Sequence, residues 1–62
     1  MHFRLLLLSG NRLNRWEEVE AEDVIVVVGQ ASRWPIGPDD HVEIWNDERK
    51  VGVVRSASKH PG

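Results

Sequence analysis

The alternation of apolar and polar residues predicts a hairpin in the first third of the chain. Residues 3–8 are mostly leucine, and this strand is apolar enough to be covered on both faces. The turn follows at residues 9–11, where glycine and asparagine tolerate positive φ. From residue 13 to residue 21 the chain returns with Val19 on one face and Glu18 on the other, the period of two that a half-buried strand shows.

A second hairpin is predicted near the other end of the sequence. Residues 41–46 alternate between apolar and polar, residues 46–49 supply the turn, and residues 50–55 form the returning strand. The side chains expected to face the core are Val42, Ile44, Val51 and Val53.

The segment between the hairpins admits two interpretations. Its five β-branched residues at 24–28 have strand propensity, but Glu22 and Asp23 make a poor two-residue turn and suit a helix N-terminus. A helix over residues 23–33 ends before Pro35 and tolerates Gly29 at a cost of about 1 kcal/mol relative to alanine. Its buried stripe contains Val24, Val27, Val28 and Ala31.

The favoured fold is therefore α+β, a four-stranded antiparallel sheet with one helix in the order ββαββ. The alternative is an all-β, five-stranded small barrel in which the valine-rich run is a strand. Either fold is one domain over residues 1–55, with a flexible tail at 56–62. Trp34 and Ile36, in the proline-rich loop after the helix, are expected to close one end of the core.

Length and composition limit the function. A domain of 62 residues buries only about 60% of the surface of its unfolded chain, and without cysteine it relies on packing or on a partner. The leucine run is too short for a membrane span or a secretion signal, so we expect a cytoplasmic protein without membrane association. The net charge of -2 lacks the basic excess typical of nucleic-acid binding.

Candidate catalytic chemistry is sparse. The histidines at 2, 41 and 60 are isolated, which argues against a metal site, and no phosphate-binding loop or nucleophile elbow is present. His41 follows Asp39 and Asp40, but a junction between loop and strand is an ordinary place for polar residues. The sequence therefore predicts a protein that is not an enzyme and has no cofactor.

The strongest binding candidates are two tryptophans on the outward faces of their strands, Trp16 and Trp45. Large aromatic side chains beside charged residues are typical of interface anchors. The chain is also rich in acidic residues, and an acidic patch would attract a basic partner surface. We expect a protein-binding module whose anchors are Trp16 and Trp45 and whose charged rim is Glu18, Glu20 and Glu43.

Two other functions stay open. A small nucleic-acid-binding barrel would contact phosphates through Arg12, Arg15, Arg49, Lys50 and Arg55, if the two hairpins bring these residues into one stripe. A purely structural homodimer would use the outward tryptophans to bury surface that so small a core leaves exposed.

Four segments carry a resemblance to a known class of proteins: residues 3–5, 16–23, 40–45 and 51–55. Together they resemble short bacterial proteins of unknown function that share a strand–strand–helix–strand–strand plan. The chain departs from that class in its valine-rich central segment, where the class has an alanine-rich helix. The resemblance implies the fold and no functional residues. Size and charge suit a bacterial or phage accessory protein, such as an inhibitor that occupies a partner's surface.

Overall fold

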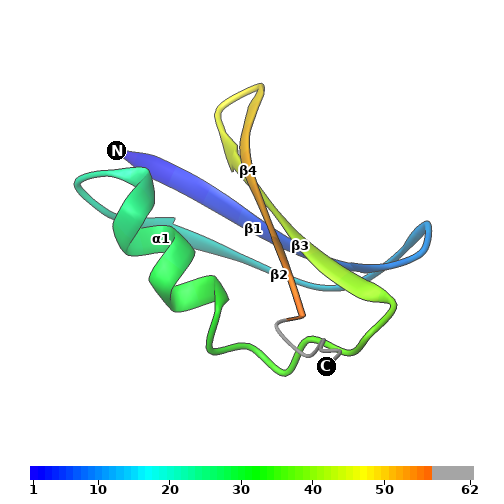
Figure 1. Cartoon of the computed structure of the whole chain (residues 1–62). Helices are drawn as coiled ribbons and strands as arrows, with labels where there is room; N and C mark the ends of the chain where they lie inside the picture. The colour runs from blue at the N-terminus through cyan, green and yellow to red at the C-terminus, as the bar shows by residue number, and fades with distance from the viewer. Residues whose placement is uncertain (57–62) are drawn as a thin grey trace.

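The computed structural model describes residues 1–56 and confirms the ββαββ plan (Figure 1). One short helix separates two antiparallel hairpins in the chain. The elements are β1 (His2–Ser9), β2 (Arg12–Glu20), α1 (Val24–Ala31), β3 (Asp40–Asn46) and β4 (Arg49–Arg55).

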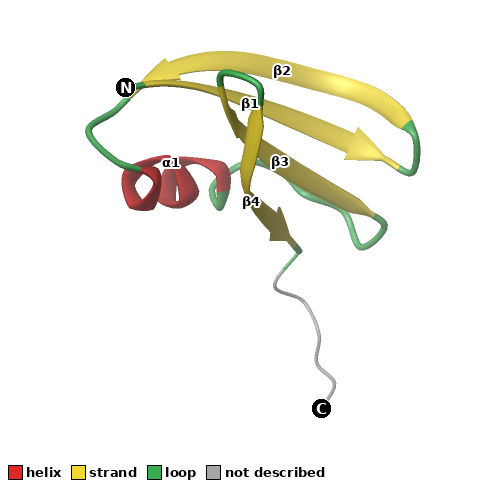
Figure 2. Cartoon of the chain, turned by 90° about the horizontal axis from the view of Figure 1, so that it is seen from above, coloured by secondary structure: helices red, strands yellow, loops and turns green. Residues whose placement is uncertain are grey.

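The four strands form one open antiparallel sheet in the order β2-β1-β3-β4. Strand β1 is central because it pairs with both β2 and β3, so the two hairpins lie side by side. Figure 2 shows α1 on one side of the sheet and no helix on the other. The five-stranded barrel is wrong, since residues 24–31 are helical and the sheet does not close.

The first hairpin turns where the sequence predicts. Gly10 has φ 63, the left-handed region that glycine occupies without a Cβ penalty, and it lies between the paired residues Ser9 and Arg12. A register shift between Leu7 and Leu8 leaves Asn14 as an extra residue in β2. This bulge lies on the turn side of Trp16, which therefore keeps the same face as Glu18.

Helix α1 begins and ends for local reasons. Asp23 is the N-cap, and its carboxylate accepts a hydrogen bond of 3.2 Å from the Val26 N–H. At the other end, the Ser32 hydroxyl donates to the Val28 carbonyl at 2.8 Å. The helix ends at Ala31, earlier than predicted, because the N–H groups of Arg33 and Trp34 bond to the carbonyls three residues back, those of Gln30 and Ala31, in a tighter turn before Pro35.

The core lies between α1 and one face of the sheet. Its fully buried members are Phe3, Leu5, Leu7, Val27, Ala31, Val42 and Ile44. Trp34 and Ile36 pack against this cluster from the loop after α1, as predicted. The prediction that β1 is covered on both faces is wrong, because α1 is the only helix in residues 1–56 and lies against one face.

The inward face of β4 also differs from the prediction. The β3–β4 turn pairs Asn46 with Arg49, and without interruption this pairing would put Val51 and Val53 over the core. A second bulge between Ile44 and Trp45 instead places Gly52 opposite Ile44 and Val54 opposite Val42. Val54 thus packs on the core, whereas Val53 points away from α1 and is exposed.

Two sequence expectations concern the ends and the location of the chain. The predicted tail at 56–62 lies outside the described residues except for Ser56. Within residues 1–56, no helix has the length and apolar character needed to cross a membrane.

Two glycines make the backbone account testable. At Gly29 an added Cβ meets open space in a helix, so Gly29→Ala should raise the free energy of unfolding by about 1 kcal/mol. At Gly10 a Cβ also meets open space, but the positive φ makes Gly10→Ala costly by about 1–2 kcal/mol. Urea denaturation followed by tryptophan fluorescence checks both, and equal effects of the two substitutions would contradict the assigned backbone conformations.

Candidate functional site

The candidate site is the sheet face that α1 leaves uncovered, called here the open face. Strand register places every second residue of β1 on it, together with the residues opposite them in β2 and β3. Its apolar members are Leu6, Leu8, Leu13, Trp16, Trp45 and Val53. Charged side chains lie between and around them.

Trp16 is the most exposed aromatic side chain on the open face, with 54% of its surface accessible. It lies opposite Leu6 and lines a shallow hollow of about 230 Å³. The other lining residues are Arg4, Leu6, Leu13 and Glu18. A large exposed aromatic ring beside an apolar hollow with charged walls is typical of a protein-binding surface.

Trp45 is on the same face but more enclosed. Its indole Nε1 donates a hydrogen bond of 3.1 Å to Oε1 of Glu43, two residues earlier on β3. Strand β1 separates Trp45 from Trp16, so the two rings do not pair across neighbouring strands. Trp45 lies opposite Arg4, one row of side chains away from Trp16.

Glu43 is the best-connected side chain of the open face. Besides the Trp45 indole, it meets His41 Nε2 at 3.3 Å and Lys50 Nζ at 3.5 Å. Its side chain is only 19% exposed. The hydrogen bond from Trp45 is the main influence holding the pKa of Glu43 below its usual value, with smaller support from His41 and Lys50. Glu43 therefore fixes the position of Trp45.

The other two predicted rim acids are also paired within the chain. Glu18 lies 3.3 Å from His2 Nε2 and 3.8 Å from an Arg4 guanidinium nitrogen. Glu20 shares a hydrogen bond of 2.9 Å with His2 Nδ1, which lowers the pKa of that carboxyl. The open face is thus a mixture of opposite charges, and its acids do not form a separate negative patch.

The apolar residues that complete this surface could not be identified from the sequence pattern. Leu6, Leu8 and Arg4 alternate with the core residues of β1. In a half-buried strand, an alternation of apolar and polar residues would have marked these positions as outward-facing. Uniform leucine at residues 5–8 concealed it. Val53 was assigned to the core because the bulge in the second hairpin has no distinct sequence mark.

The residues of the nucleic-acid alternative do not come together. Arg12 and Arg15 lie on β2, whereas Arg49, Lys50 and Arg55 lie on β4, the opposite edge of the sheet. Arg15 lies on the α1 side, where its guanidinium stacks 4.1 Å from the centre of the Trp34 ring and pairs with Glu17 at 2.8 Å. The basic residues therefore lie at two separate edges of the sheet and do not form the single stripe that this alternative needs.

The adjacent Asp40 and His41 point to different partners. Asp40 accepts hydrogen bonds from the Ser9 hydroxyl and the Gly37 N–H, and these contacts hold its pKa below the usual value. His41 meets Glu43 on the open face. Asp40 therefore closes the loop before β3, consistent with the structural interpretation of these polar residues.

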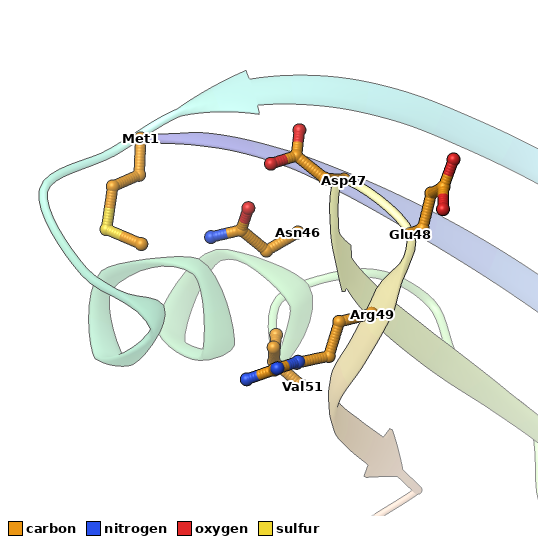
Figure 3. A pocket seen from close by; sticks show the side chains of 6 residues that line it. All are labelled: Met1, Asn46, Asp47, Glu48, Arg49 and Val51. Atoms are coloured by element: carbon orange, nitrogen blue, oxygen red, sulfur yellow. The ribbon is translucent and has the colours of Figure 1, made fainter.

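A second hollow, of about 580 Å³, lies between the N-terminus and the β3–β4 turn (Figure 3). Its lining residues are Met1, Asn46, Asp47, Glu48, Arg49 and Val51. In Figure 3 the Asp47 side chain extends toward the Met1 side and the Glu48 side chain points away from it, so the two carboxylates do not converge. Nowhere in residues 1–56 do three histidine, cysteine or acidic side chains gather in a way that suits a metal ion.

Comparisons with protein-family models, curated proteins and solved structures found no match to this chain. The geometry of the open face is therefore the basis for its functional assignment.

The contact between Glu43 and Trp45 gives a pH-dependent prediction. Since folding lowers the pKa of Glu43, its stabilising contribution is present above the usual value of 4.5 and is lost as the pH falls through the lower, folded pKa. Glu43→Gln should lower the free energy of unfolding by about 1 kcal/mol at neutral pH, and the difference from wild type should shrink in acid. Urea denaturation from pH 7 to pH 3 measures this, with Glu48→Gln in the exposed turn as the control.

Because the basic residues lie at opposite edges of the sheet, we predict weak binding to polyanions. A ligand on one face or edge would neutralise only a few phosphate charges, so we expect elution from heparin at low salt, with a shallow salt dependence. Retention that persists at high salt and is lost in both Arg12→Gln and Arg55→Gln would contradict this separation.

Proposed function

We propose that this protein is a noncatalytic binding module that holds a partner protein on the open face of its sheet. The observation that carries the proposal is the exposure of Trp16 and Leu13 on a face that no element of residues 1–56 covers. Most small sheets bury one face and fill the other with polar residues. Here that second face keeps an apolar centre.

Trp16 is the proposed principal anchor. Burying a tryptophan against a partner removes roughly 150–250 Å² from water, and central aromatic residues dominate the energy of many interfaces. The hollow beside Trp16 would accept an apolar side chain of the partner, with Arg4 and Glu18 at its edge. Trp45 would add a second contact, already oriented by Glu43 before binding.

The charges of the open face suggest the character of the partner surface. Glu18 and Glu43 are matched by Arg4 and Lys50, and Glu20 shares a hydrogen bond with His2, so a strongly basic partner would gain little from these acids. A partner with an apolar centre and a rim of both charges fits better. Such contacts orient the partner and exclude others more than they add affinity.

A module of this size acts by occupying a surface. The proposed role is that of an accessory or inhibitor protein that blocks a partner's site or holds it in place. The nucleic-acid alternative gains no support from the positions of the basic residues, at opposite edges of the sheet.

Affinity capture with matched variants tests the proposal. The full chain is immobilised and exposed to extract of the source organism, and captured proteins are identified by mass spectrometry. Trp16→Ser should weaken binding of the partner by about thirtyfold or more, as expected for a central aromatic anchor. Ile25→Ser should leave binding unchanged, because Ile25 is 76% exposed on α1, on the other side of the sheet.

Both variants replace an exposed apolar side chain with serine, and the two positions lie on opposite sides of the sheet. Circular dichroism establishes that both remain folded. A captured protein that is retained equally by Trp16→Ser, or lost equally with Ile25→Ser, would show that the open face is not the binding surface.

A further inference from the structure

The outer edge of β2 is an unusually accessible place for another strand. Strand β2 ends the sheet, and along residues 1–56 its outer edge pairs with no strand. All of its residues except Val19 are exposed. Its unpaired backbone N–H and C=O groups can therefore accept an added strand.

This edge has charged side chains and one bulge, but it lacks other features by which proteins prevent strand addition. It is nine residues long, and the segment from Arg12 to Glu20 contains neither proline nor lysine. The bulge at Asn14 lies toward one end and leaves Arg15 to Glu20 as an uninterrupted stretch. The opposite edge, β4, is shorter and has its bulge at Val51, within the strand.

The charges of the two edge strands differ in a way that selects a partner. In β2 the bases come first, Arg12 and Arg15, and the acids follow, Glu17, Glu18 and Glu20. Two antiparallel copies of β2 would place the basic half of one against the acidic half of the other. In β4 all charges are positive, at Arg49, Lys50 and Arg55, so two antiparallel copies would bring like charges together.

We propose that two copies of this chain join through β2, antiparallel, about a two-fold axis at Trp16, to form a continuous eight-stranded sheet. In this register each Arg15, which also contacts Glu17 of its own chain at 2.8 Å, lies directly opposite Glu17 of the second copy, on the α1 side of the sheet. The regular pairing covers residues 15–17 of both copies, because residues 18–20 of one copy face residues 12–14 of the other, which contain the bulge. The two Trp16 rings meet on the open face. Opposite charges and aromatic rings in directly facing positions both stabilise a strand pair.

The neighbouring registers are unfavourable. Directly opposed residues of a continuous sheet share a face, so the pairing can shift only in steps that preserve the alternation of side chains. Centring the axis on residue 15 would oppose the two Arg15 side chains, and centring it on residue 17 would oppose the two Glu17 side chains. Of these three registers, only the one centred on Trp16 places residues of opposite charge, Arg15 and Glu17, directly opposite each other.

The size of the contact limits its strength. One strand pair and one aromatic contact bury less than the roughly 1,200–2,000 Å² of a standard stable interface. The dimer should therefore dissociate on dilution. In this dimer each Trp16 contacts the Trp16 of the second copy, so dimerisation and partner binding share that side chain, which also lines the hollow beside Leu6. The open-face residues of β3 lie outside the contact.

Charge exchange tests the register. Sedimentation equilibrium of the full chain, from about 1 micromolar to about 1 millimolar, should show a reversible dimer, since interfaces below the standard size dissociate in this range. Arg15→Glu and Glu17→Arg should each weaken self-association at least about tenfold, because each puts like charges at both symmetric positions. An equimolar mixture of the two variants should form a heterodimer of roughly wild-type affinity, because each variant then supplies the charge that the other lacks.

A heterodimer in the mixture would show that each variant alone fails to associate because of its charge and not because it is unfolded. Circular dichroism monitors the effect of each substitution on folding. Arg49→Glu on β4 is the control and should leave the dimer intact. A wild-type chain that stays monomeric at the highest concentration overturns the proposal. So does a dimer that survives both single variants, or a mixture that does not associate.

These results are distinguishable from those of the capture experiment. Arg15 and Glu17 lie on the α1 side, so their variants keep the open face unchanged. A monomeric chain that still captures a protein through Trp16 would refute the dimer and retain the binding function. A chain that dimerises, but whose Trp16→Ser variant captures the same proteins as wild type, would refute the binding function and retain the dimer.

Discussion

The packing of one eight-residue helix against one face of the sheet is the constraint on which the structure depends. The sheet's share of the buried core comes from Phe3, Leu5 and Leu7 of β1 and from Val42 and Ile44 of β3, and the helix provides Val27 and Ala31. A helix of this length spans about 12 Å and covers only one side of a four-stranded sheet. The open face and the free edge of β2 both follow from that shortage of covering elements.

The same constraint explains why polar contacts are dense on the uncovered side. Without a second layer, the open face is organised by ion pairs and hydrogen bonds between neighbouring strands. Glu43 connects His41, Trp45 and Lys50, and His2 connects two glutamates of β2. Such exposed pairs contribute little stability individually, but the hydrogen bond to Glu43 holds Trp45 in a defined orientation before any partner binds.

The fold was predictable where local chemistry and hydrophobic period agreed. Asp23 favoured a helix start over a strand despite the valines after it, and its carboxylate does cap the helix. Gly10 marked the first turn. The face of Trp16 followed from the alternation of β2, because the bulge is at Asn14, on the turn side of Trp16, and does not change the register between Trp16 and Glu20. Strand alternation therefore placed both proposed anchors on the same face.

The sequence by itself determined the element order, the helix cap, the first turn and most of the core, because each depends on residues close together in the chain. Tertiary structure decided the rest. The bulge in β4 exchanged Val53 for Val54 in the core, and pairing of β1 with β3 sent the basic residues to opposite edges. Both outcomes depend on strand pairing between distant segments, which a period of two leaves undetermined.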